Sequence, residues 1–271
     1  MSERLVPDPS TPGAFRVMTG PTSQSWVDPA DPTRLEFEYV QRIADGLDAT
    51  VLTADPERRL RVVHIGGGGL SLPRYVEARR PHTAQIVLEP DGDLIEEVRR
   101  KLPLPRRTGI KVRITDGRAG LELMPADYAD AIILDAFDGS TVPPSLVTDE
   151  FFDEVVLRLR PGGVFFFNLA DRAPFGWAKR VVGGVAERLR HVHLVAEPAV
   201  LKGRRYGNLV VAASASPLPH GDLDDGAHHA VFPQRSLFGR ELTRWIGGAQ
   251  AFTDADAAAA PVPREGGFWF Q

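Results

Sequence analysis

Short runs of β-branched and aromatic residues alternate with helical patterns between Arg61 and Ser214. The runs at 131–134 and 164–167 are apolar at every position. A strand can be apolar throughout only where helices cover both faces of its sheet, which is the arrangement of parallel strands joined by crossover helices. The pattern therefore predicts a wound α/β sheet at the centre of the chain.

The central region is expected to hold seven strands and four long helices. The strands are expected at 61–65, 85–89, 111–115, 129–134, 163–169, 191–196 and 208–213, and the helices at 72–80, 93–102, 148–160 and 175–189. The last two strands follow one another without a helix between them. We therefore expect a hairpin there, which makes one strand antiparallel at the edge of a mostly parallel sheet.

The flanking segments are expected to be extensions of one large domain. Residues 1–60 form a small N-terminal extension of strand and helix, in which a helical pattern begins at Thr33 and puts Leu35, Tyr39 and Ile43 on one face. The domain itself spans 61–215. A C-terminal tail, 216–271, is expected to contain one or two helical turns at 240–246 and a loose alanine- and proline-rich stretch at 254–263.

Composition excludes several kinds of chemistry. The chain has no cysteine, so disulfides, thiolate metal sites and cysteine nucleophiles are ruled out. Seven histidines are present, but those in the expected strands and the pair at 228–229 show no metal-ligand spacing, so no metal is expected. The net charge is only −4, which argues against a nucleic-acid partner, and the basic clusters at 99–107 and 202–205 are expected to be solvated.

Membrane association and export are not expected either. The longest apolar runs are far shorter than the ~20 residues of a membrane helix. The first 13 residues lack the apolar core of a signal peptide. A cytoplasmic location is therefore expected.

Four consecutive glycines, residues 66–69, separate the first expected strand from the first expected helix. Glycine allows a backbone to turn with positive φ and to approach a ligand closely, and the following helix offers free N–H groups. Glu89 ends the second strand, 21 residues after Gly68, where an acidic side chain can accept both hydroxyls of a ribose. Asp116 and Gly117 end the third strand, where a carboxylate can meet an adenine amino group. These features predict a nucleotide-type ligand.

The identity of that ligand is narrowed by one missing glycine. A nicotinamide dinucleotide fingerprint needs a third glycine three residues after the second, and that position is Ser71. Adenosine attached to a sulfonium fits the pattern better. The alternative interpretation, that the glycines only allow tight packing of a strand against a helix, remains open at this point.

Two carboxylates, Asp135 and Asp138, follow the most apolar strand. The fourth strand of such a sheet lies beside the first, so Asp135 is expected to face the glycine turn. Carboxylates placed there can hold an ammonium group or accept a proton from an attacking amine. An aspartate before a glycine also stabilises turns, which is a competing explanation for Asp138.

Taken together, these motifs resemble the spermidine synthase family of aminopropyltransferases. The similarity covers about residues 24–219 and rests on Gln24-Ser25, Glu36 to Gln41, Ile65 to Gly68, Glu89-Pro90-Asp91, Asp116-Gly117 and Asp135 to Asp138. It implies a Rossmann-like class I methyltransferase fold. It also implies a donor, decarboxylated S-adenosylmethionine or S-adenosylmethionine, and a small amine as acceptor, with a homodimer as one assembly found in the family.

The resemblance assigns roles to individual residues. Asp135 and Tyr39 would deprotonate the amine, and Asp138, Phe137 and Gln41 would lie beside the acceptor. Glu89 would hold the ribose and Asp116 would contact the adenine. The donor site as a whole would comprise Gln24, Gly66, Gly67, Gly68, Glu89, Pro90, Asp116, Gly117 and Asp135.

The chain departs from the family pattern mainly in the half that binds amines. Gly69 stands where the family has an aspartate that faces the donor's amine, and Leu70 stands where it has glycine. Ala136 and Phe137 replace two hydroxyl residues, and Val40 replaces a polar one. Three hypotheses follow: an aminopropyltransferase, a methyltransferase that uses intact S-adenosylmethionine on a small molecule, and a nucleoside-binding protein without catalytic activity.

Overall fold

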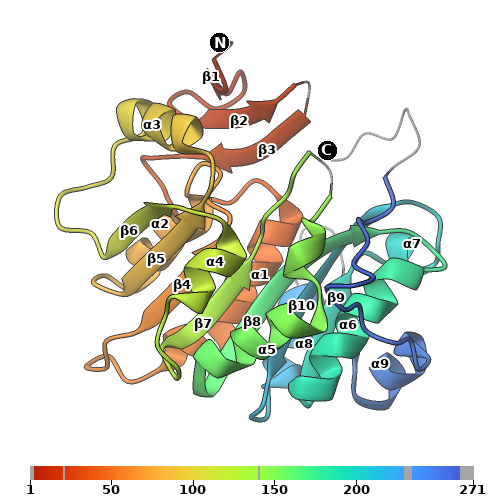
Figure 1. The fold of residues 1–271 in the computed structure, drawn as a ribbon. Coiled ribbons are helices and arrows are strands. Elements are labelled where there is room, and N and C mark those ends of the chain that lie inside the picture. The colour runs from red at the N-terminus through yellow and green to blue at the C-terminus, as the bar shows by residue number, and fades with distance from the viewer. Residues whose placement is uncertain (1–2, 21, 140, 229–233, 263–271) are drawn as a thin grey trace.

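An eight-stranded sheet forms the centre of the protein (Figure 1). The computed structural model describes residues 3–20, 22–139, 141–228 and 234–262. The order of the strands is β11-β9-β10-β8-β7-β4-β5-β6. Their bounds are β4 (Arg61–Ile65), β5 (Ala84–Glu89), β6 (Ile110–Ile114), β7 (Ala129–Leu134), β8 (Leu159–Asp171), β9 (His191–Ala196), β10 (Gly207–Ser214) and β11 (Arg235–Phe238).

The direction of winding reverses at β4, as the sequence predicts. Strand β4 pairs in parallel with β5 on one side and with β7 on the other, and β7 continues in parallel to β8. A ligand site in a wound sheet lies at such a switch point, outside the carboxyl ends of the strands. The adjacent ends of β4 and β7 therefore define where the site is expected.

Two details of the predicted sheet are wrong. The sheet has eight strands in the described part of the chain, not seven, because β11 adds to β9. The antiparallel strand β10 lies between β8 and β9 rather than at the edge. Its residues 209–214 are buried, which is the property of an interior strand covered on both faces.

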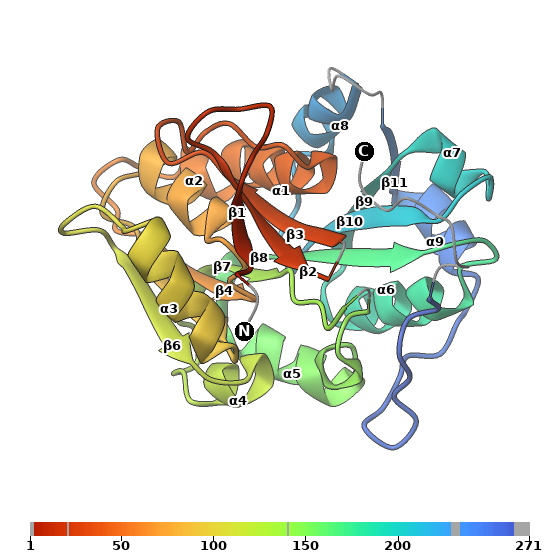
Figure 2. The ribbon, with the colours of Figure 1, turned by 90° about the horizontal axis from the view of Figure 1, so that it is seen from above.

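Helices cover both faces of the sheet, and Figure 2 shows α1 and α2 on the side opposite α5 and α6. The clusters of buried side chains place α3 and α8 on the α1 side, and α4 and α9 on the α5 side. The bounds are α1 (Glu38–Ala49), α2 (Ser71–Arg79), α3 (Gly92–Lys101), α4 (Gly117–Glu122), α5 (Asp149–Arg158), α6 (Gly176–Arg188), α7 (Pro198–Leu201), α8 (His220–His228) and α9 (Gly239–Ile246), with short 3₁₀ turns η1 (Val51–Thr53) and η2 (Pro144–Leu146).

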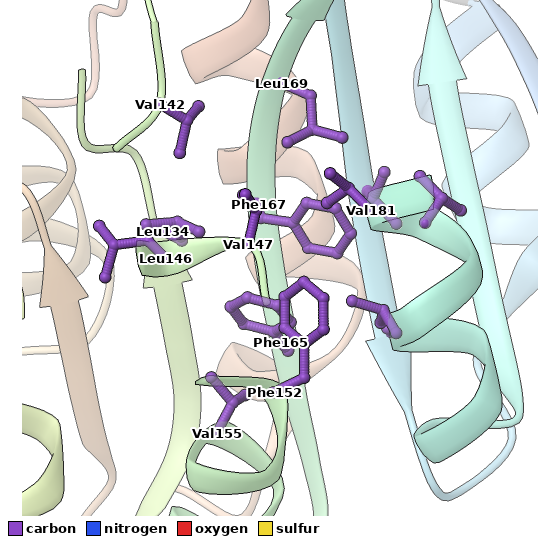
Figure 3. Close-up of a cluster of buried hydrophobic side chains, with 14 of the residues drawn as sticks. Leu134, Val142, Leu146, Val147, Phe152, Val155, Phe165, Phe167, Leu169 and Val181 are labelled. Carbon is purple, nitrogen blue, oxygen red and sulfur yellow. The ribbon is translucent and has the colours of Figure 1, made fainter. Parts of the chain in front are cut away.

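The larger core lies between the sheet and the α4, α5 and α6 layer (Figure 3). Phe165 and Phe167, two residues apart on β8, point to the same face and stack with ring centroids 4.8 Å apart. Phe152 of α5 packs against Phe165 at 6.3 Å. Burying each of these rings contributes about 2–3 kcal/mol, so the aromatic run that predicted this strand also anchors the helix layer on it.

A three-stranded antiparallel sheet formed by β1 (Leu5–Pro7), β2 (Phe15–Thr19) and β3 (Thr22–Val27) lies above the carboxyl ends of the central strands (Figure 1). It is tied to α3 by Glu97, whose Oε1 accepts the N–H of Leu5 at 2.8 Å. Arg4 forms an ion pair with Asp91. This N-terminal sheet therefore forms a roof over the switch point.

The first helix begins later than the sequence pattern predicts. Residues 33–37 are not helical, and α1 starts at Glu38 with Phe37 as its N-cap. Tyr39 and Ile43 do share the buried face, as expected. Leu35 packs against the same core from outside the helix.

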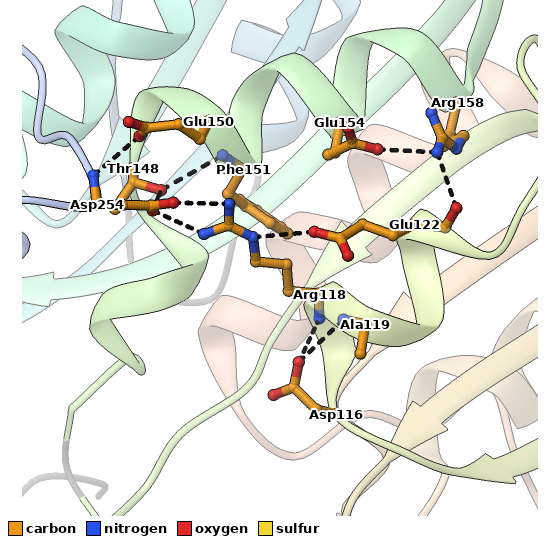
Figure 4. Close-up of polar contacts among 10 residues, drawn as sticks. All are labelled: Asp116, Arg118, Ala119, Glu122, Thr148, Glu150, Phe151, Glu154, Arg158 and Asp254. Carbon is orange, nitrogen blue, oxygen red and sulfur yellow. Dashed lines mark hydrogen bonds and ion pairs between the residues drawn. The ribbon is translucent and has the colours of Figure 1, made fainter.

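The C-terminal stretch from residue 254 is not loose in its described part. Asp254 accepts two hydrogen bonds from the Arg118 guanidinium at 2.7 and 2.8 Å and one from the Thr148 hydroxyl at 2.7 Å (Figure 4). Further along, the Trp177 indole donates to the carbonyl of Ala258 at 2.7 Å. The composition of this stretch predicted a loose segment, because composition does not reveal partners that are distant in the sequence. Residues 263–271 lie outside the described residues.

Candidate active site

A cavity of about 800 Å³ lies under the N-terminal sheet, at the carboxyl ends of β4, β5 and β7. Its wall contains nearly all of the residues that the sequence singled out, although they come from six separate segments. These are Gln24, Tyr39, Gly66, Gly67, Gly68, Glu89, Pro90, Asp116, Gly117, Asp135, Phe137 and Asp138. The structure thus brings the expected donor and acceptor residues around one space.

The glycine turn is shaped by contact with the neighbouring strand end. Gly66 has φ +95°, and a Cβ there would lie 2.3 Å from the backbone oxygen of Asp135. The Asp135 N–H in turn donates to the carbonyl of Ile65 at 2.9 Å. Only glycine fits at residue 66, because both the backbone angle and the space exclude a side chain. The turn therefore brings its backbone next to Asp135, as expected.

Glu89 is held in place by two backbone donors. Its Oε2 accepts the N–H of Gly67 at 2.7 Å and its Oε1 accepts the N–H of Asp91 at 3.0 Å. A carboxylate oxygen has two lone pairs, so each oxygen keeps acceptor capacity toward the cavity that the residue lines. Two oriented acceptors side by side are the geometry that a ribose diol requires.

Asp116 caps α4 and lines the cavity at the same time. Its Oδ1 accepts the N–H groups of Arg118 and Ala119 at 2.9 and 3.0 Å (Figure 4). Both bonds use one oxygen, so Oδ2 is available to a ligand. The next residue is a glycine, and a Cβ at residue 117 would lie 2.3 Å from Ile65. The absence of a side chain there lets the start of α4 pack closely against β4.

Asp135 forms a polar group with Tyr39 and Asn168. The Tyr39 hydroxyl donates to the Asp135 carboxylate, and Asn168 Nδ2 donates to Asp135 Oδ1 at 3.3 Å. Asp135 keeps some accessible surface toward the cavity, but the surrounding protein withdraws it from water. This burial raises its pKa to about 6, and the hydrogen bonds from Asn168 and Tyr39 only partly oppose the shift.

Tyr39 stays protonated in this arrangement. It is buried, and burial together with the neighbouring Asp135 charge raises the pKa of its phenol well above the ordinary value. The hydroxyl is therefore a hydrogen-bond donor that orients the carboxylate. Asp135 remains the group that can take up a proton near neutral pH.

The loop after β7 completes the opposite wall. Asp138 is exposed to the cavity, while its backbone forms a tight turn with Thr141. The turn is closed by backbone groups of Asp138 rather than by its carboxylate. Gln24 of β3 reaches across and donates from Nε2 to the carbonyl of Gly139 at 3.0 Å, which connects the roof with this loop.

Gln41 does not lie at the cavity, in contrast to the expectation. Its Nε2 donates to the carbonyl of Leu35 at 2.6 Å, so the side chain stabilises the approach to α1. Residues two apart on a helix do not face the same side. Because Tyr39 points into the cavity, Gln41 must point elsewhere.

Gly69 is surrounded by the N-terminal sheet. A Cβ at this position would lie 2.6 Å from Val27 Cγ2 and 3.2 Å from both the Ser25 hydroxyl and Val17 Cγ2. The space that an aspartate side chain would need is therefore filled by β2 and β3. Nearby, the Ser25 and Ser71 hydroxyls lie 2.9 Å apart, and Ser71 also donates to the carbonyl of Trp26 at 2.7 Å.

Asn168 was not predicted as a site residue. It is a buried amide in β8, directly after three phenylalanines, and its Oδ1 has no partner among the described residues. A polar residue that directly follows the apolar run 164–167 is the signal that could have identified it, because buried polar groups need a partner.

Metal binding and membrane insertion find no support in the described part of the chain. It contains no group of three or more histidine, aspartate or glutamate side chains placed to hold a metal ion. Among the same residues, none of the helices has the length and apolar character needed to span a membrane. His229 lies outside the described residues.

Several known proteins resemble this chain in sequence or in fold. No protein-family model matches the chain. The crystal structure of a probable spermidine synthase from Corynebacterium glutamicum superposes with a TM-score of 0.86 and 29% identity, over 96% of this chain and 95% of that one. A polyamine aminopropyltransferase from Chromobacterium violaceum is 28% identical over 148 residues, or 54% of each chain. In sequence and in fold, the chain is therefore similar to spermidine synthases.

Methyltransferases are also among the proteins that this chain resembles. Putrescine N-methyltransferase 2 from Nicotiana attenuata is 34% identical over 107 residues, which is 38% of this chain and 29% of that protein. Human methyltransferase-like protein 13 shares the fold with a TM-score of 0.56 and 22% identity, over 80% of this chain and 95% of that one. The chain spans about half the length, or less, of the curated relatives it matches.

Proposed function

We propose that the protein is a transferase that moves an aminopropyl group from an adenosyl-sulfonium donor to a small polyamine-like amine. The observation that carries the proposal is the pairing of Asp135 with Tyr39 across the same cavity from Glu89 and Asp116. One end thus offers acceptors for an adenosine, and the other offers a carboxylate for an amine.

The donor is proposed to lie over the glycine turn as a substrate. Glu89 would accept hydrogen bonds from the two ribose hydroxyls, and Asp116 Oδ2 would accept one from the adenine amino group. The roof of β2 and β3, connected through Gln24 to the loop after β7, would exclude water from the reacting atoms. The N-terminal extension would thus act as a lid on the domain 61–215.

The acceptor must lose a proton before it can react. An alkylammonium has a pKa near the ~10.4 of lysine and no free electron pair. Asp135, oriented by Tyr39 and Asn168, would accept the proton. The amine nitrogen then attacks the carbon next to sulfur, the carbon–sulfur bond breaks, and the sulfur leaves with the electron pair as the neutral thioether of methylthioadenosine. Positioning supplies much of the rate in such a displacement.

The alternative is that the enzyme transfers a methyl group instead of an aminopropyl group. Gly69 lacks the carboxylate that would hold an aminopropyl ammonium, and Val27 and Ser25 fill the space around it. The absence of that charge also removes a group that would repel the carboxylate of intact S-adenosylmethionine. The similarity to proteins named putrescine N-methyltransferases supports the same alternative.

Product analysis separates the two reactions. The purified protein is incubated with each donor in turn, and with putrescine, spermidine or cadaverine as acceptor. Aminopropyl transfer releases methylthioadenosine, whereas methyl transfer releases S-adenosylhomocysteine. We expect methylthioadenosine from the decarboxylated donor, and the reaction should be at least about a hundredfold slower in Asp135→Asn. Product from S-adenosylmethionine alone would establish the alternative, and no product from any pair would contradict both.

A further inference from the structure

His64 is a buried histidine of β4 that the proposed mechanism does not use. Its side chain is only 2% exposed, yet it forms part of the cavity wall. Side chains alternate between the two faces of a strand, so the next residue on the same face is Gly66, which has no side chain to cover the imidazole. The strand registers place Gly66 level with Glu89 and Asp135. The imidazole therefore lies on the same face of the sheet as Gly66, two residues before the level of Glu89 and Asp135 at the strand ends.

A chain of hydrogen bonds fixes which nitrogen of His64 carries the proton. Gln85 Nε2 donates to the carbonyl of Pro73 at 3.1 Å, which determines the orientation of the amide. Gln85 Oε1 consequently faces His64 Nε2 at 2.9 Å. Because an amide oxygen can only accept, Nε2 must hold the proton. The other nitrogen, Nδ1, is then a hydrogen-bond acceptor.

The remaining nitrogen is directed to the cavity and carries no charge. Nδ1 of His64 has no hydrogen-bond partner among the described residues. It is not among the polar atoms that are both unpaired and fully buried, so it keeps some accessible surface. The space that it reaches is the cavity. Burial lowers the pKa of this imidazole to about 4, so it is neutral at pH 7 and can only accept there.

We propose that His64 Nδ1 accepts a hydrogen bond from the ammonium group on the aliphatic chain of the sulfonium donor. An ammonium has three N–H donors and no acceptor, which makes it the complement of an unpaired imidazole nitrogen. Gly69 offers the donor chain no carboxylate, so an acceptor has to come from elsewhere in the wall. A neutral imidazole attracts the ammonium without repelling a neighbouring carboxylate, and it therefore suits both candidate donors. This inference rests on the proposed donor site.

The test compares ligands with and without the ammonium. Methylthioadenosine carries the adenosine but no amine chain, whereas S-adenosylmethionine and its decarboxylated form carry both. Binding is measured by titration calorimetry at pH 7.5. We expect His64→Leu to weaken binding of the amine-bearing donor by about tenfold or more, and to leave the affinity for methylthioadenosine unchanged. His64→Asn puts an amide oxygen near the position of Nδ1 and should restore part of the loss.

Two controls separate binding from structural damage. His193→Leu removes another buried strand histidine, one that does not line this cavity, and should change neither affinity. The double variant His64→Leu with Gln85→Leu avoids leaving the Gln85 amide oxygen unpaired, because replacing both partners by apolar groups can be nearly neutral. It should show the same loss for the amine-bearing donor alone.

Several outcomes would overturn the assignment. An equal loss for both ligands would make His64 a structural residue, and no loss for either would show that Nδ1 makes no contact. A higher KM for the acceptor amine with unchanged donor affinity would transfer the contact to the acceptor. If methylthioadenosine failed to bind the unaltered protein, the proposed donor site itself would be wrong, and that result is recognisable before any variant is made.

Discussion

At the scale of single residues, the reaction depends on the ionisation of Asp135. Its pKa of about 6 lies above the value of an exposed aspartate because the group is buried. The carboxylate must be ionised to accept a proton, so activity should fall as the pH drops below about 6 and level off above it. Rates of product formation measured from pH 5 to 8 would show this limb. Asp135→Asn should lower kcat by about 10²–10⁴-fold, and a variant with an unchanged pH profile would exclude Asp135 as the base.

Glu89 is the corresponding residue for the donor. Glu89→Ala removes the acceptors for two hydroxyl groups and should weaken donor binding by about 1–3 kcal/mol. Calorimetry with methylthioadenosine measures the change without any contribution from catalysis. Glu96→Ala, an exposed glutamate on α3, is the matched control and should bind normally. An unchanged affinity in Glu89→Ala would show that the ribose lies elsewhere.

The sequence could predict those site residues whose position at the end of a parallel strand is enough to place them at the site. Glu89, Asp116 and Asp135 lie at or just beyond the ends of parallel strands, whose carboxyl ends meet at one edge of the sheet. Asn168 and His64 could not be assigned in this way, because a polar residue within a strand faces the site only if its neighbours leave it open. That depends on pairing across the sheet, which one sequence does not show.

At the scale of elements, the N-terminal sheet and the glycine turn constrain each other. Gly69→Ala would bring a methyl group within 2.6 Å of Val27 Cγ2 and should cost about 1–3 kcal/mol of unfolding free energy. Urea unfolding measures the cost. Gly221→Ala serves as the control, because a Cβ there meets nothing within 4 Å.

A double-mutant cycle tests whether the contact with Val27 causes that cost. Val27→Ala alone leaves a cavity, but combined with Gly69→Ala it removes the clash. The two changes should therefore couple favourably by about 0.5–3 kcal/mol. Purely additive effects would show that another neighbour, or the backbone, limits residue 69.

The elements that could be predicted are those with a strong local pattern. Strands β4, β7 and β9 have the predicted bounds, and the four predicted helices match within two residues at each end. Strands β1 and β11 are short, and each is stabilised by pairing with a neighbouring strand of its sheet rather than by its own periodicity. The same reason explains why the position of β10 inside the sheet was missed.

At the scale of the whole molecule, Glu97 connects the roof to the central domain. Burial acts to raise its pKa, but the N–H groups of Leu5 and Arg4 and the charge of Lys101 outweigh that effect and lower the pKa. The ionised form is thus favoured in the folded protein. Its contribution to stability is present above the ordinary pKa of a glutamate and is lost as the pH falls through the lower folded value.

Removing the Glu97 side chain should destabilise the N-terminal sheet before the rest of the protein. Glu97→Ala leaves the Leu5 N–H unpaired and should speed hydrogen exchange at residues 5–18, with a loss of about 1–3 kcal/mol in local stability. Donor affinity should also fall, because Arg4, Val17 and Met18 line the cavity. Mass spectrometry of exchanged peptides and calorimetry measure the two effects. Unchanged exchange over β1 and β2 would contradict the role given to Glu97.

The pairing of Arg118 with Asp254 has a practical consequence for anyone who works with this protein. The two residues lie 136 positions apart, and Arg118 belongs to the first turn of the helix that Asp116 caps. A shortened version that stops before residue 252 would leave this arginine with Glu122 alone as an acidic partner and disturb the proposed adenine end of the cavity. Expression tags and truncations at that end therefore need to spare the segment 252–262.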